Sequence, residues 1–274
     1  MLKTDMKIRI SLLLTVIVAL ALFSACEQSD PPIREFSLVW ADEFNGDELD
    51  RDKWDVQLGD GSDYGLWRWG NEEDQYYQAE NVSVANGFLR IAAVADSVAG
   101  YGYTSGRIRT VGSGDFKYGR IEASIRMDNT PGLWHAFWML PTDPTEPWPV
   151  SGEIDIMEYV GNSPNEVLTT IHFADPFGNR NLLGNSFPFQ PDGNFHVYTT
   201  EWDQNKIVWY YDETEVFEVL RTNDAVSNTW PFDAAFHLLL NVAVGGNLGG
   251  NVNAAALQAP KLMEVDYVRV YQSN

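Results

Sequence analysis

The chain has 274 residues, of which 45% are hydrophobic, and a formal net charge of −21 at pH 7. So acidic a surface repels nucleic acids and anionic membranes, so neither is expected as a direct partner. The chain is also rich in aromatic residues, with 10 Trp, 12 Tyr and 14 Phe. Some of these rings must build a core, and those beside Gly and Pro are free to line a ligand-binding cleft.

Residues 1–25 are expected to form an export signal. Lys3, Lys7 and Arg9 give a positive start, and an apolar run follows over residues 10–23. That run is shorter than the ~20 apolar residues that a membrane-spanning helix needs. A charged start, a short apolar stretch and small residues at 24–25 are typical of a cleaved signal peptide.

Cys26 follows directly and is the only cysteine, so it cannot form an internal disulfide. The segment 22–26 (Leu-Phe-Ser-Ala-Cys) resembles a bacterial lipobox, in which the signal is cut before the cysteine and the thiol is lipidated. The alternative is an unmodified cysteine beside an ordinary cleavage site. We predict an exported protein that is lipid-anchored to the cell envelope, with Glu27 favouring the outer membrane, and a polar tether over residues 26–35.

From residue 36 onward the pattern is that of short β-strands. Alternating or β-rich runs recur at 89–93, 119–125, 196–202, 206–211 and 263–271, separated by turns rich in Gly, Asn and Asp. Evenly spaced short strands with such turns indicate an all-β sandwich or jelly roll. No linker or internal repeat divides the sequence, so we predict one domain over residues 36–274.

Three acids stand in an otherwise apolar run, Gly152–Glu158. In a regular strand Glu153 and Asp155 share one face, but Glu158 points to the other face. One extra residue near Ile156 and Met157, a β-bulge, would return Glu158 to the face of the other two acids. The spacing therefore predicts a bulge at this point.

Acids placed so close together raise each other's pKa values. Cleavage of a glycosidic bond needs one ionised and one protonated carboxyl group at the same pH, which such a cluster provides. With the bulge, Glu153 and Glu158 lie roughly 13 Å apart along the backbone. Their side chains could approach to about 5–6 Å, close to the spacing of retaining glycosidases. The alternatives are an exposed acidic strand or a calcium site, although calcium ligands usually come from loops.

The run from Ser151 to Glu158 resembles the signature of glycoside hydrolase family 16 in its bulge-containing form. Further similar segments spread the resemblance over residues 36–274; they are 40–46, 103–108, 118–122, 132–141, 241–247 and 265–271. The resemblance implies a β-jelly-roll sandwich of two curved antiparallel sheets with a cleft on the concave face. It implies a retaining double displacement without a cofactor. In that reaction Glu153 is the nucleophile, Glu158 the acid/base and Asp155 an auxiliary carboxylate.

Within the family, residues 69–77 look most like the laminarinase type of endo-β-1,3-glucanase. This implies a β-1,3-glucan substrate, with mixed-linkage β-1,3/1,4-glucan as a secondary one. Three residues depart from the common pattern near the expected cleft: Glu72, Asp74 and His135. The implied sugar-binding residues are Asn71, Arg107, Trp134, Trp138, Trp148 and His172.

The family also implies one structural calcium ion away from the catalytic site. The matching ligands would be Glu43, the carbonyl of Gly87 and Asp266. Oxygen ligands from both ends of the domain would tie its termini together.

Other readings remain open from the sequence. The same chemistry could act on agarose, porphyran or carrageenan, although Arg68, Arg107 and Arg109 are the only cations in the cleft segments. The chain could be a non-catalytic glycan-binding surface lipoprotein, or a retaining enzyme that transfers the sugar to another sugar. We expect a monomer.

Overall fold

The computed structural model describes residues 35–273. The predictions of a signal peptide over residues 1–25, of lipidation at Cys26 and of a tether over residues 26–35 lie outside this range, apart from Glu35. Within it, no helix has the length and apolar character needed to cross a membrane.

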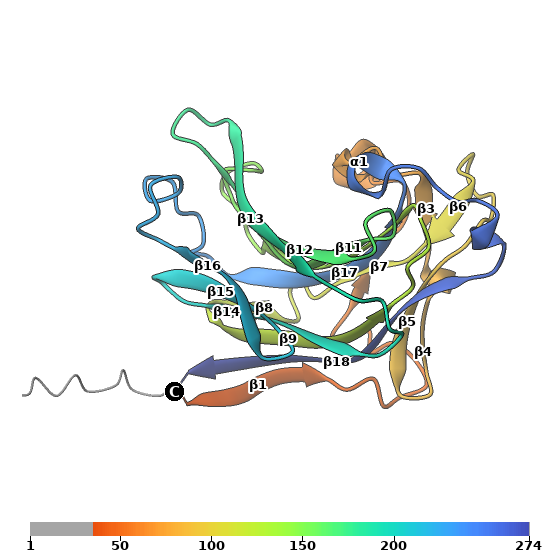
Figure 1. Ribbon diagram of the computed structural model, residues 1–274, viewed down its shortest axis with the longest axis horizontal. Helices are drawn as coiled ribbons and strands as arrows, with labels where there is room; N and C mark the ends of the chain where they lie inside the picture. The colour runs from red at the N-terminus through yellow and green to blue at the C-terminus, as the bar shows by residue number, and fades with distance from the viewer. Residues whose placement is uncertain (1–34, 274) are drawn as a thin grey trace, which may run out of the picture. The chain divides into compact units, whose positions relative to one another are not determined.

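Two large antiparallel sheets make up the domain, as the sequence predicted (Figure 1). The back sheet has the order β16 (Thr214–Leu220), β15 (Lys206–Tyr211), β14 (His196–Trp202), β9 (Gly119–Met127), β18 (Lys261–Ser273), β5 (Phe88–Ala93) and β4 (Val82–Ala85), with β1 (Phe36–Asp42) also paired to β18. The front sheet has the order β13 (Arg180–Pro188), β12 (Glu166–Ala174), β11 (Glu153–Val160), β10 (Leu133–Pro141), β17 (Phe236–Val244), β7 (Arg107–Arg109) and β2 (Asp55–Val56), with β8 (Asp115–Phe116) also paired to β17.

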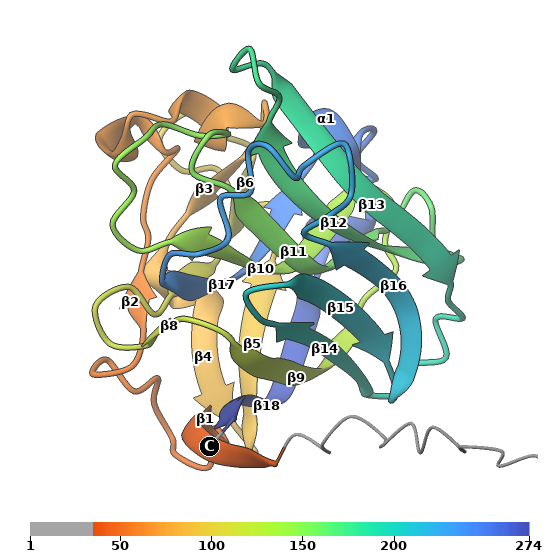
Figure 2. The ribbon, with the colours of Figure 1, turned by 90° about the vertical axis from the view of Figure 1, so that its left-hand side faces the viewer.

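Smaller elements lie at one end of the front sheet. Strands β3 (Gln75–Tyr77) and β6 (Tyr103–Ser105) form a parallel pair. The helices are short: η1 (Ser62–Tyr64), η2 (Trp67–Gly70), η3 (Ala79–Asn81), α1 (Gly246–Gly249) and η4 (Ala256–Gln258). In Figure 1 the front sheet curves between two raised rims, the β12–β13 hairpin on one side and α1 on the other. Figure 2 shows β13, β12, β11, β10 and β17 following one another across this sheet.

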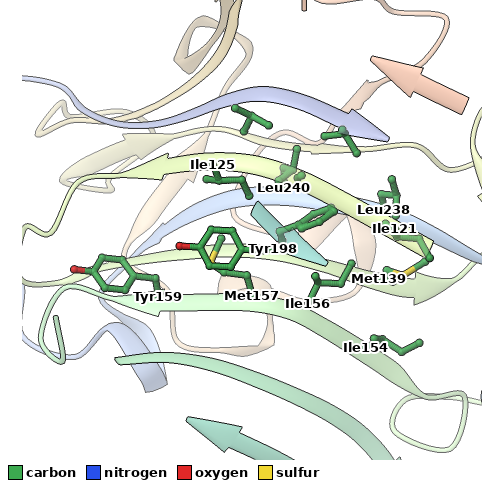
Figure 3. Close-up of a cluster of buried hydrophobic side chains, with 14 of the residues drawn as sticks. Ile121, Ile125, Met139, Ile154, Ile156, Met157, Tyr159, Tyr198, Leu238 and Leu240 are labelled. Atoms are coloured by element: carbon green, nitrogen blue, oxygen red, sulfur yellow. The ribbon is translucent and has the colours of Figure 1, made fainter. Parts of the chain in front are cut away.

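The main core fills the space between the sheets. Ile121 and Ile125 of β9 and Tyr198 of β14 lie in one buried cluster with side chains from β10, β11 and β17 (Figure 3). Removing this apolar surface from water is the main favourable term in folding. Because the inner face of the front sheet is committed to the core, its outer face is left to carry polar groups.

The predicted bulge in β11 is confirmed. Against β10, Met157 pairs with Phe137 and Asp155 pairs with the next residue, Trp138, so Ile156 has no partner. The ladder to β12 shifts at the same place, between Asp155 and Glu158. Ile156 and Met157 are both buried in the core cluster, as Figure 3 shows. The extra residue keeps Glu158 on the outer face with the other two acids.

Candidate active site

The acids of β11 form one cluster on the outer face of the front sheet. Asp155 is 2% exposed and Glu158 is 8% exposed, whereas Glu153 is half-buried. Removal from water and mutual repulsion both shift the pKa values of the carboxyl groups in such a cluster.

Each outer glutamate accepts a hydrogen bond from a tryptophan. Trp134, on β10, donates its indole N–H to Oε1 of Glu158 over 3.0 Å. Trp148, in the segment between β10 and β11, donates to Oε2 of Glu153 over 2.6 Å. Two of the residues expected to bind sugar therefore contact the two glutamates directly.

Asp155 is fixed between the glutamates. Its carbonyl oxygen accepts hydrogen bonds from Oγ1 of Thr169 at 3.0 Å and from the indole of Trp209 at 2.9 Å. Nε2 of His172 lies 3.2 Å from Oδ2 of Asp155, and His172 stands opposite Glu153 in the β11–β12 ladder. The sequence-predicted histidine therefore belongs to the cluster.

Burial raises the pKa values of all three carboxyl groups, and repulsion adds to it. The charge of Asp155 acts on Glu153, that of Glu158 on Asp155, and that of Glu153 on Glu158. His172 and the two indole donors act in the opposite direction on the glutamates. The three groups titrate together, so the cluster can hold protonated and ionised carboxyls at one pH.

Arg107 packs against two tryptophan rings beside the carboxylates. Its guanidinium lies 4.5 Å from the ring centre of Trp69 and 4.8 Å from that of Trp138, and its Nε donates to Gln57 over 2.6 Å. Arg107 is only 4% exposed. The predicted sugar contact by Arg107 is not tested by these contacts, which show that it orders two tryptophan rings.

Asn71 lies in a loop that Arg68 closes. Arg68 forms ion pairs with Glu72 and Asp74 and donates to the backbone carbonyls of Glu72 and Glu73. The acids Glu72 and Asp74, which depart from the family pattern, are therefore matched by a cation within this chain. The loop is also tied to the end of the front sheet, because Asn247 N–H donates to the carbonyl of Asn71 over 2.7 Å.

The expectation that His135 lies near the cleft is wrong. Its side chain is fully buried, and its Nε2 lies 2.8 Å from the carbonyl oxygen of Asp128. Burial lowers the pKa of His135 to about 4. On β10 it alternates with the outward-facing Trp134, so it belongs to the inner face and holds no position towards a ligand.

The calcium site stays a prediction, and one of its three expected ligands, Glu43, is already paired with a cation of this chain. The register brings their segments together, because Asp42 pairs with Val268 and Leu89 pairs with Val265. Both carboxylate oxygens of Glu43, however, accept hydrogen bonds from Arg269 at 2.8 Å. A cation already neutralises Glu43, so no role is derived for calcium at Glu43, Gly87 and Asp266.

Arg180 is a site residue that the sequence did not indicate. It is exposed on β13, and its guanidinium lies 5.2 Å from the ring centre of Trp148. Its charge also acts to lower the pKa values of Asp155 and Glu158. Nothing in the local sequence marks it; only the pairing of β12 with β13, which places Arg180 opposite Ala174, brings it to the cluster.

A curved two-sheet sandwich with paired glutamates on one face defines a glycoside hydrolase that works with carboxyl groups. Residues 69–269 match the family described as glycosyl hydrolases family 16. The chain belongs to this family.

Its relatives agree with this assignment. The chain is 37% identical to a beta-glucanase of Rhodothermus marinus, over 96% of this chain and 94% of that protein. It is 38% identical to glucan endo-1,3-beta-glucosidase A1 of Niallia circulans, over 90% of this chain but 39% of that longer protein. The laminarinase catalytic domain of Thermotoga maritima has a similar structure, with a TM-score of 0.80 and 34% identity, covering 88% of this chain and 99% of that one.

Proposed function

We propose that the chain is a retaining, endo-acting β-1,3-glucanase, with mixed-linkage β-1,3/1,4-glucan as a secondary substrate. One observation carries the proposal. The bulge at Ile156 places Glu153, Asp155 and Glu158 on one face of β11, and each outer glutamate has its own indole donor. The choice of a glucan draws on the relatives that are named for β-1,3-glucan or β-glucan hydrolysis.

The proposed reaction is a double displacement. Glu153 attacks the anomeric carbon, and Glu158 protonates the departing glycosidic oxygen. Glu158 then takes a proton from the water that hydrolyses the glycosyl ester on Glu153. Asp155 acts on both steps through its charge and through the hydrogen bond that it shares with Glu153. These roles follow the match between β11 and the family signature.

The cations of the cleft segments support a neutral rather than a sulfated substrate. Arg68 is paired with Glu72 and Asp74, and Arg109 is paired with Asp55. Arg107 is buried between two tryptophans. A sulfated galactan would need free cations at its subsites, and Arg180 is the candidate for such a contact.

A panel of polysaccharides tests the proposal. Laminarin, lichenan, agarose and carrageenan are incubated with the protein, and new reducing ends are measured. We expect release from laminarin first and lichenan second, with Glu153→Ala inactive on both. Release from agarose alone would overturn the glucan assignment. Binding of laminarin without turnover by the unaltered protein would favour a glycan-binding protein instead.

We further propose that the mature protein is a monomer, held at the cell envelope by lipid on Cys26. The support for the lipid anchor is the lipobox-like segment before Cys26 and the fact that Cys26 is the only cysteine of the chain. Several acyl chains on one residue would anchor the protein far more firmly than a single chain.

A further inference from the structure

Glu73 is a buried acid that the proposed reaction does not use. It lies just before β3 and is 1% exposed. Its Oε1 accepts a hydrogen bond from Nδ2 of Asn71 at 3.3 Å. Its Oε2 accepts from Nε2 of Gln75 at 2.5 Å and from the hydroxyl of Tyr77 at 3.0 Å. Both oxygens of this carboxyl group therefore have partners within the protein.

The directions of the hydrogen bonds that link Trp138 to Glu73 are fixed by their neighbours. The indole N–H of Trp138 can only donate, and it donates to Oδ1 of Asn241 at 2.8 Å. Asn241 must then present its Nδ2 to the oxygen of Tyr77, 3.1 Å away. Because that oxygen accepts from Asn241, its own O–H is free to point at Glu73.

Gln75 is oriented in the same way. Its Oε1 accepts the backbone N–H of Val244 at 2.7 Å, so its Nε2 faces Glu73 as a donor. Three donors therefore converge on Glu73, and the two that contact Oε2, Gln75 and Tyr77, have their own oxygens engaged by Val244 and Asn241. Oε2 of Glu73 thus acts only as an acceptor. Burial raises the pKa of Glu73, and the charge of Arg107 and the three donated hydrogen bonds act in the opposite direction.

We infer that Glu73 is a positioning residue, a buried carboxylate that fixes Asn71 and Trp138 together beneath the substrate. It holds Asn71 directly, and it holds Trp138 through Tyr77 and Asn241. The inference rests on the proposed function, because it assumes that Asn71 and Trp138 contact the glucan. It gives that function a specific structural basis: one buried carboxyl group sets two separate sugar contacts.

Glu73→Gln is the sharpest substitution, because it keeps the shape and removes one acceptor. The remaining oxygen can serve Gln75 and Tyr77, but the new amide then faces Nδ2 of Asn71. Asn71 must lose this hydrogen bond or turn its amide over and present the reversed end to the sugar. We expect the KM for laminarin to rise about 3- to 10-fold, as for one lost hydrogen bond, with kcat within about 2-fold of the unaltered protein.

A double substitution separates positioning from general damage. If Glu73 acts through Asn71, then Asn71→Ala combined with Glu73→Gln should have the KM of Asn71→Ala alone. Glu264→Gln is the matched control: Glu264 is also buried, at 8% exposed, and is hydrogen-bonded to Arg90 and Arg126, but it lies in the back sheet. We expect it to lower the melting temperature and leave the KM unchanged.

The link from Glu73 through Tyr77 and Asn241 to Trp138 gives an independent test that does not need the Glu73→Gln protein to fold. Tyr77→Phe removes the hydroxyl that links Glu73 to Asn241, and Trp138→Phe removes the indole donor. When the two substitutions are combined, the KM should rise by less than the product of the two single effects. The inference would be overturned if the effects on KM were independent in both double variants. It would also be overturned if the KM of Glu73→Gln equalled that of the unaltered protein. Failure of the unaltered protein to cleave laminarin would instead overturn the proposed function, and the same variants would then be measured on the polysaccharide that it does cleave.

Discussion

The indole N–H of Trp148 donates to Oε2 of Glu153 over 2.6 Å, although Trp148 is 46% exposed. Burial raises the pKa of Glu153, and this donated hydrogen bond works in the opposite direction. The pKa of Glu153 stands raised to about 8, and this surface side chain favours the ionised form that the proposed nucleophile needs. Its ring also meets His172 and Arg180, which hold it over the cluster.

Trp148→Phe should therefore shift the pH dependence of the reaction. Without the donor the pKa of Glu153 rises, so the acidic limb of the kcat/KM profile should move to higher pH. The measurement is kcat/KM for laminarin across pH, with Trp67→Phe as a control because Trp67 is exposed and contacts Arg68 instead. An acidic limb that stays in place would show that this hydrogen bond does not control the nucleophile.

Replacing Glu158 should lower the cleavage rate most for substrates with poor leaving groups. Glu158→Ala removes the proposed proton donor, so the rate of glucan cleavage should fall by about 100-fold or more. An aryl glucoside with an activated leaving group needs little protonation, and its glycosylation step should be far less affected. Kinetics on both substrates check this, with Glu153→Ala expected to abolish both reactions. Equal losses on the two substrates for Glu158→Ala would contradict the assignment.

Glu158 should also lower the free energy of unfolding at neutral pH. Burial, aided by the charge of Glu153, raises the pKa of Glu158 from 4.5 to about 7 in the folded state. Between these values the folded state binds more protons than the unfolded state, so stability falls as pH rises through this window. Glu158→Gln removes the charge and keeps an oxygen for Trp134. It should raise stability by up to about 3 kcal/mol at pH 7 and by almost nothing below pH 4.

Thermal unfolding across pH measures this gain. Glu80→Gln is the control, because Glu80 is exposed and lies outside the cluster. A melting temperature that rises equally at pH 4 and pH 7 would mean that the gain has another origin than the buried charge.

Cys26→Ser should release the protein from the membrane fraction without changing its turnover. The serine hydroxyl cannot receive the thioether-linked lipid, while the catalytic domain starts ten residues later. Fractionation of cells followed by laminarin assays of both fractions checks this. A Cys26→Ser protein that stays with the membrane would refute the lipid anchor.

The sequence by itself determined the strands and the acid cluster. Alternation and turn residues report burial on one face of a strand, which is a local property. The bulge at Ile156 could be predicted because the three acids and three apolar residues at positions 153–158 fit no regular strand. The resemblance to family 16 then supplied the roles of Glu153 and Glu158.

Only the tertiary structure decided what surrounds those acids. Arg180 reaches Trp148 because β13 pairs with β12, and His135 points into the core because of its place on β10. Glu73 gains its partner Tyr77 locally, but the link onward to Trp138 crosses to β17 through Asn241. Such contacts join residues far apart in the chain, so no short stretch of sequence contains them. Pairing and packing set the environment in which the acids work.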